Sequence, residues 1–124
     1  MKSFIFSLLF MSTAIIAAAA DTPSLTGDWT VHSNIGGNES DMTCSFTQKD
    51  KDLSGICKTH EGNVNIKGYV SDKDKKVMWT YKSEYNGSPL TVTYTGSLDT
   101  DKVTGTVKVE EFNVDGEFTA TPSK

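Results

Sequence analysis

Apolar and polar residues alternate along most of the chain after residue 20, with the period of two that β-strands produce. Threonine, valine, tyrosine and phenylalanine fill many of these positions, and residues typical of turns recur about every twelve positions. The pattern predicts eight strands and no helix. Their ranges are 25–33, 42–49, 53–60, 63–71, 76–84, 90–98, 103–112 and 116–121.

The alternation also predicts which side chains face inward. The inward sets are Trp29 and Val31; Cys44 and Phe46; Val77, Trp79 and Tyr81; Leu90, Val92 and Tyr94; and Val103, Val107 and Val109. The fourth strand is left open, because Val64 and Ile66 share one face while Tyr69 takes the other.

Eight short strands joined by turns predict an all-β fold, an eight-stranded antiparallel up-and-down barrel whose closure removes exposed edges. A two-sheet β-sandwich is the alternative. The links after residues 49, 71 and 98 each contain Asp-x-Asp, whereas those at the other end are richer in glycine and asparagine and mostly longer. We therefore expect one closed end and one end that forms a mouth.

The two cysteines, Cys44 and Cys57, flank the polar turn at Asp50-Lys51. If the chain folds back about this turn, residues whose numbers sum to 101 pair, and Cys44 meets Cys57. The spacing is not Cys-x-x-Cys, which favours a structural disulfide over a redox role. Closing the 14-residue loop (44 to 57 inclusive) is worth about 3 kcal/mol of chain entropy.

Residues 1–20 predict a signal peptide. Lys2 begins the segment, an apolar run follows from Phe4 to Ile16, and Ala18-Ala19-Ala20 fits a cleavage site. The remaining residues, 21–124, suit a single domain. We therefore expect a secreted or periplasmic protein with no transmembrane segment after cleavage; a retained anchor is the alternative.

The charge balance argues against nucleic acid as a partner. The formal net charge is −4, and every one of the 12 basic residues is lysine. A protein without arginine lacks the bidentate phosphate and guanine contacts that nucleic-acid recognition favours.

Aromatic residues are the best candidates for contacting a ligand. Trp79, Tyr81 and Tyr94 are expected to face inward, with Tyr85 at the rim; a packed core is the alternative for such rings. His32 and His60 fall toward the mouth, although surface histidine is the simpler interpretation. No spacing typical of a metal site or of a catalytic constellation occurs, so we expect no metal, no cofactor and no enzyme activity.

The segment Leu25-Thr26-Gly27-Asp28-Trp29-Thr30 resembles the Gly-x-Trp start of the first strand in calycin barrels, which include lipocalins and avidins. The resemblance implies a ligand-binding barrel in which Gly27 and Trp29 form a structural plug at the closed end. Val31 and Ile35 stand where avidins carry biotin-binding asparagine and serine, so biotin binding is not implied.

Together these patterns predict an exported, non-catalytic, lipocalin-like protein that binds a small or partly apolar ligand at its mouth. The alternative is a protein-binding module, such as an inhibitor of a secreted enzyme, which presents its loops to a partner and needs no cavity.

Overall fold

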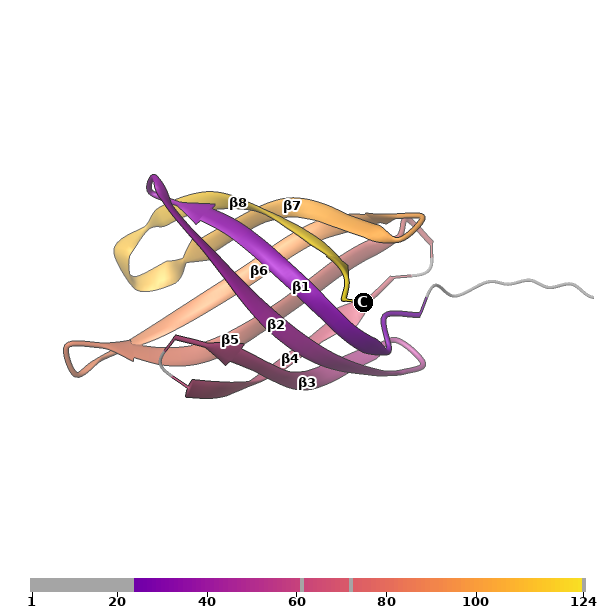
Figure 1. Cartoon of the computed structure of the whole chain (residues 1–124), viewed down its shortest axis with the longest axis horizontal. Coiled ribbons are helices and arrows are strands. Elements are labelled where there is room, and N and C mark those ends of the chain that lie inside the picture. The colour runs from indigo at the N-terminus through magenta and orange to yellow at the C-terminus, as the bar shows by residue number, and fades with distance from the viewer. Residues whose placement is uncertain (1–23, 61, 72, 124) are drawn as a thin grey trace, which may run out of the picture.

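The computed structural model describes residues 24–60, 62–71 and 73–123; the signal peptide predicted at residues 1–20 lies outside this part. The described chain is a closed barrel of eight antiparallel strands in sequence order, with β8 returning to pair with β1 (Figure 1). This architecture confirms the predicted up-and-down barrel and excludes the sandwich. The elements are β1 (Gly27–Ile35), β2 (Asn38–Lys49), β3 (Asp52–Thr59), β4 (Gly62–Val70), β5 (Lys76–Tyr85), β6 (Ser88–Asp99), β7 (Lys102–Val109), the 3₁₀ turn η1 (Glu110–Phe112) and β8 (Val114–Pro122).

Two hairpins at the mouth are longer than their sequences predict. β1 and β2 pair as far as Ile35 with Asn38, and β5 and β6 pair as far as Tyr85 with Ser88. Each turn is therefore only two residues long, and both residues have positive φ: 60° and 89° at Gly36-Gly37, and 53° and 82° at Asn86-Gly87. Such turns match the twist of a hairpin. The prediction of longer mouth loops is wrong at these two links.

The third mouth connection that differs from expectation follows β7. The predicted strand 103–112 ends at Val109, and residues Glu110–Phe112 form a turn of 3₁₀ helix that closes with Asn113 in the left-handed conformation. The alternation of apolar and polar residues breaks at Glu110-Glu111, immediately after the end of the strand.

The inward-facing sets are confirmed by burial, and the open case of β4 is resolved. Ile66 and Val70 are buried inside the barrel, whereas Tyr69 faces outward and is 47% exposed. Hence the fourth strand contributes its even-numbered residues to the interior.

The register of the second hairpin agrees with the sequence prediction. Cys44 lies directly opposite Cys57, and the pairing continues to Lys49 and Asp52 beside the turn. The two cysteines form a disulfide, with their Cα atoms 4.0 Å apart, and both are fully buried. The predicted disulfide is therefore confirmed, and it braces neighbouring strands from inside the barrel.

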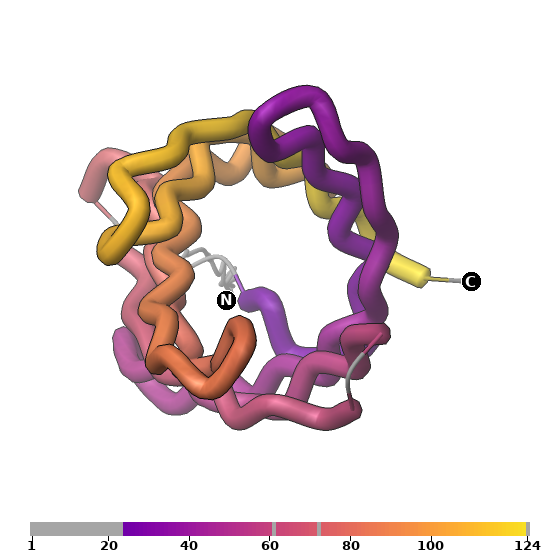
Figure 2. The backbone as a smooth tube through the Cα atoms, turned by 90° about the vertical axis from the view of Figure 1, so that its left-hand side faces the viewer, coloured from indigo at the N-terminus to yellow at the C-terminus, as the bar shows by residue number. Residues whose placement is uncertain are grey.

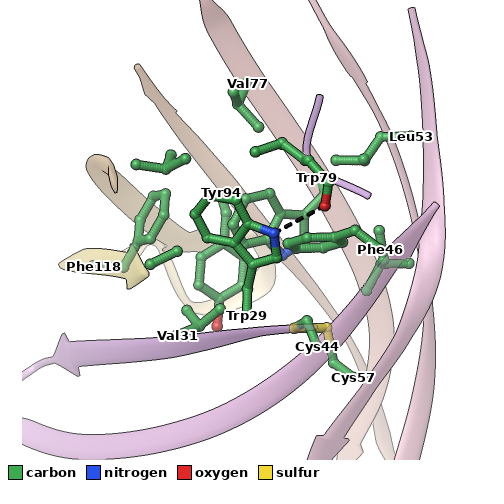
Figure 3. Close-up of a cluster of buried hydrophobic side chains, with 14 of the residues drawn as sticks. Trp29, Val31, Cys44, Phe46, Leu53, Cys57, Val77, Trp79, Tyr94 and Phe118 are labelled. Atoms are coloured by element: carbon green, nitrogen blue, oxygen red, sulfur yellow. Dashed lines mark hydrogen bonds between the residues drawn. A yellow bond between two sulfur atoms is a disulfide. The ribbon is translucent and has the colours of Figure 1, made fainter. Parts of the chain in front are cut away.

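The half of the barrel toward the closed end contains a cluster of packed aromatic rings. Trp79 stacks on Tyr94 with ring centroids 4.9 Å apart, and it also contacts Phe46 and Phe118 at 5.0 Å and 5.3 Å (Figure 3). Trp29 lies nearer the closed end, with its ring centroid 6.5 Å from that of Phe46. Burial of these large rings contributes apolar stabilisation to the fold.

The segment before β1 closes this end of the barrel. Leu25 is fully buried, and its carbonyl accepts a 2.9 Å hydrogen bond from the indole nitrogen of Trp29. The backbone N–H of Leu25 in turn donates to the side-chain oxygen of Gln48 on β2. Seen from the mouth, the indigo segment that leads into β1 lies inside the ring of strands (Figure 2).

Inward-facing glycines let neighbouring strands approach closely. Gly96 on β6 and Gly105 on β7 lie opposite each other, and a Cβ added at either would stand 2.4 Å or less from backbone atoms of the partner strand. Gly68 is tighter still, since its added Cβ would lie 1.8 Å from the carbonyl oxygen of Met78. These positions allow the strong curvature of a small barrel.

Candidate ligand pocket at the barrel mouth

A pocket of about 240 Å³ opens at the mouth, above the aromatic core. Its walls come from β1, β2, β5, β6 and β7, together with the end of β3. The lining residues are Ser33, Ile35, Ser40, Asp41, Met42, Thr59, His60, Tyr81, Ser83, Glu84, Tyr85, Leu90, Val92, Tyr94 and Val109. The mixture of aliphatic, aromatic and hydroxyl side chains is typical of a small-molecule site.

Four of the six residues predicted from sequence as ligand contacts line this pocket. They are Tyr81, Tyr85, Tyr94 and His60. Tyr94 forms the boundary with the core, because its ring stacks on Trp79 while the residue also lines the pocket. In Figure 3 the Tyr94 hydroxyl points away from Leu53 and Val77, which lie toward the closed end.

Trp79 does not line the pocket. Alternation places it inside the barrel as predicted, but it lies one layer too deep and is fully buried among other rings. Its indole nitrogen is the single buried side-chain nitrogen or oxygen in the described chain for which no hydrogen-bond partner is found. Trp79 is therefore a core residue in this structure.

His32 does not line the pocket either, because it is an outward-facing residue of β1. Its ring contacts two carboxylates on β2, with Nδ1 bonded to Asp41 and Nε2 3.3 Å from Glu39. The hydrogen bond with Asp41 is the largest influence and raises the pKa of the imidazole above its ordinary value of 6.5. This cluster lies on the outer wall of the barrel.

The floor of the pocket is a row of hydroxyl groups that crosses the barrel interior. The phenol of Tyr94 on β6 lies near the side chains of Tyr81 on β5 and Ser33 on β1, and both side chains influence its pKa. The rings of Tyr81 and Tyr94 stack with their centroids 6.3 Å apart. Ser33 Oγ lies 3.4 Å from Ser40 Oγ on β2. Burial, followed by the influence of Tyr81, raises the pKa of Tyr94 well above its ordinary value, so the phenol stays protonated.

Ser33 is the residue that sequence reasoning missed. It is 4% exposed and is the one buried polar residue in the part of the chain that the structure describes. The alternation that places Trp29 and Val31 inward also places Ser33 inward and His32 outward, so the signal was present. Its contact with Tyr94 joins strands that are not neighbours, and residue spacing does not reveal such a contact.

The charged residues that border the pocket belong to its rim. Asp41 lies between the inward-facing residues Ser40 and Met42, and Glu84 lies between Ser83 and Tyr85. Both carboxylates are exposed, as is His60 in the turn after β3. Below the rim, the described residues that line the pocket are therefore uncharged.

One wall of the barrel separates near the mouth. Within the described residues, β4 and β5 pair only over residues 67–70 and 77–80. Above that point β5 continues to Tyr85 with β6 alone, while β4 begins at Gly62 with β3 alone. This separation lies beside Tyr81 and Ser83, two residues that line the pocket.

At the rim, Glu111 of η1 is hydrogen-bonded to Thr91 of β6. Its carboxylate accepts hydrogen bonds from the backbone nitrogen of Thr91 at 2.7 Å and from the Thr91 hydroxyl at 2.9 Å. The backbone contact contributes most to lowering the pKa of Glu111. Next to it, Phe112 packs edge-on against Tyr85 with centroids 6.0 Å apart, and both rings are more than half exposed.

No protein-family model matches the chain, and no curated protein matches it. The described residues include no helix that is long and apolar enough to cross a membrane. They also contain no group of three or more histidine, cysteine, aspartate or glutamate residues placed to hold a metal ion.

Proposed function

We propose that this protein is an exported, non-catalytic, lipocalin-like binding protein that holds a small, partly apolar molecule in the pocket at the mouth of its barrel. The observation that carries the proposal is the contrast inside the barrel. Buried rings and aliphatic side chains fill the closed half, whereas a pocket of about 240 Å³, lined by aliphatic, aromatic and hydroxyl side chains, lies at the mouth.

The size of the pocket limits what it holds. Ligand pockets commonly measure about 300–1,000 Å³, so a volume of about 240 Å³ suits a compact molecule or one end of a longer one. A longer ligand would project through the mouth or through the separation between β4 and β5. The exposed ring of Tyr85 would then cover its outer part.

Export is part of the same proposal. The predicted signal peptide at residues 1–20 supports it, as does the Cys44–Cys57 disulfide, since such bonds persist in oxidising compartments. The short Gly27-x-Trp29 segment supports the lipocalin-like comparison, because Trp29 packs at the closed end of the barrel.

The test is to block the pocket without changing the outside of the barrel. Val109→Trp places a large ring among the lining residues, and Lys108→Trp places the same ring on the neighbouring outward position. Titration with N-phenyl-1-naphthylamine, an uncharged fluorescent probe, is expected to show saturable binding to the wild type and to Lys108→Trp. Val109→Trp should bind at least tenfold more weakly. Equal binding by the two variants would contradict the proposal.

A protein-binding module is the second candidate function. The observation that favours it is the pair of exposed rings at the rim, Tyr85 and Phe112, because aromatic residues are enriched at protein interfaces. An inhibitor of a secreted enzyme would use this surface and leave the pocket empty. Capture of one secreted enzyme by the wild type and by Val109→Trp, but not by Phe112→Ser, would support this candidate over a ligand carrier.

A further inference from the structure

The chemistry of the pocket changes with depth. On β1 and β6 the aliphatic residues Ile35 and Leu90 line the pocket nearer the mouth than Ser33 and Tyr94 of the same strands. The floor of the pocket carries the hydroxyl groups of Tyr81, Tyr94 and Ser33, which line the pocket together, and the rings of Tyr81 and Tyr94 stack. Below the polar rim, a molecule that enters therefore meets Ile35 and Leu90 before it reaches the hydroxyl groups of Ser33 and Tyr94.

The hydroxyl row is suited to a partner that both donates and accepts. Each hydroxyl has one donor and two acceptor sites, and its hydrogen rotates to suit its neighbours. Because these hydrogens rotate, the hydroxyl groups can present either a donor or an acceptor to a ligand. The phenol of Tyr94 in the middle of the row stays protonated, so it can both donate and accept a hydrogen bond.

Among the described residues that line it, the pocket offers no buried charged partner to a charged ligand. An ion taken out of water needs an opposite charge or several hydrogen bonds in compensation. The carboxylates that border the pocket, Asp41 and Glu84, are exposed at the rim, and Asp41 is engaged with His32 on the outer wall. An acidic chain of net charge −4 also disfavours anions.

We propose that the pocket selects an uncharged molecule with a hydroxyl or carbonyl group at one end, and that this group sits on the hydroxyl row of Tyr81, Tyr94 and Ser33 while the apolar body points to the mouth. The inference rests on the proposed ligand-binding function and adds the class and the orientation of the ligand. A phenol, an alcohol or a ketone with a compact apolar body fits this description.

The experiment pairs a ligand with its analogue and a protein with its variant. The probes are 1-naphthol, which carries a hydroxyl, and naphthalene, which does not; 1-naphthoate and 1-naphthylmethylamine supply the anion and the cation. Isothermal titration calorimetry of the full folded domain measures the dissociation constant of each. We expect 1-naphthol to bind the wild type at least about threefold more tightly than each of the other three.

The variant Tyr81→Phe removes one hydroxyl of the row and keeps the ring. It should weaken 1-naphthol about three- to tenfold, the range of a single uncharged hydrogen bond, and leave naphthalene within about twofold. Ser33→Ala should give the same split between the two probes. Tyr69→Phe is the matched control, since Tyr69 faces outward from β4 and should change neither constant.

The possible failures are distinguishable. Equal binding of 1-naphthol and naphthalene, with no effect of Tyr81→Phe, would overturn the inference while leaving the pocket as a ligand site. Tighter binding of 1-naphthoate or 1-naphthylmethylamine than of 1-naphthol would overturn the claim that the ligand is uncharged. If none of the four probes bound the wild type, the proposed function would fail, and the inference with it.

Discussion

The closed half of the barrel and its mouth half are built from the same eight strands, yet their interiors differ in chemistry. Below Tyr94 the interior is a packed set of rings and aliphatic side chains that includes Trp79 and Phe118. Above Tyr94 it is a pocket with serine and tyrosine hydroxyls on its floor. Strand β6 contributes residues to both environments. Tyr94 on this strand belongs to both, because its ring packs in the core and its hydroxyl group faces the pocket.

The packed core and the proposed binding site are separated along the barrel axis. Large apolar residues at the closed end bury enough surface to hold the fold. The mouth is then free to carry polar groups that a packed core would exclude, because an unpaired buried polar group costs free energy. The indole nitrogen of Trp79 is such a group, since it is buried in the core and has no hydrogen-bond partner among the described residues.

The largest effect is expected from a cavity in the closed half. Trp79→Ala should lower the free energy of unfolding by about 3–5 kcal/mol, the range for truncating a buried aromatic residue. Leu90 lies at the mouth and is half-buried, so Leu90→Ala should lower the free energy of unfolding by less than about 2 kcal/mol. Urea denaturation of both variants measures the difference. Equal losses of unfolding free energy in the two variants would contradict the claim that the closed half contributes more to stability than the mouth half.

The disulfide is expected to give the next largest effect. Replacing both cysteines, Cys44→Ala with Cys57→Ala, should lower the free energy of unfolding by about 3 kcal/mol through loss of the loop constraint. Binding of N-phenyl-1-naphthylamine should stay within about threefold, since neither cysteine lines the pocket. Reduced wild-type protein provides the control. Unchanged stability in the double variant would show that the bond does not brace the barrel.

The smallest effect is expected on the outer wall at His32. Because its folded pKa is raised, chiefly by the hydrogen bond with Asp41, its contribution to stability is fully present below pH 6.5 and is lost as pH rises through the folded pKa. His32→Gln should therefore melt slightly below the wild type in acidic buffer and equal it at alkaline pH. An NMR titration of the ring gives the pKa directly. A value at or below 6.5 would contradict the ion pairs with Asp41 and Glu39.

Much of the fold follows from local patterns in the sequence. Alternation gives the eight strands and the inward-facing sets, and the turn at Asp50-Lys51 gives the register that joins Cys44 to Cys57. The ends of the strands are less predictable. The long hairpin of β5 and β6 includes Pro89 and Ser88, which carry no strand signal, but they pair with Glu84 and Tyr85 because the Asn86-Gly87 turn holds the two strands together.

The candidate site is predictable only in part. The tyrosines at 81, 85 and 94 follow from their position on inward-facing or rim segments. The depth of each residue along the barrel axis does not, since it depends on the stagger between strands, and for that reason Trp79 falls in the core. The contact between Ser33 and Tyr94 crosses the interior between strands that are not paired, so it emerges only from the closed barrel.

The most direct test of the central claim is an NMR chemical-shift map of the ¹⁵N-labelled protein titrated with 1-naphthol. We predict that the largest shift changes fall at Ser33, Tyr81 and Tyr94, with little change at Leu53 and Val77 in the closed half. Changes centred on the closed half or on the outer wall near His32, or no saturable changes anywhere, would contradict the division of this barrel into a packed end and a binding end.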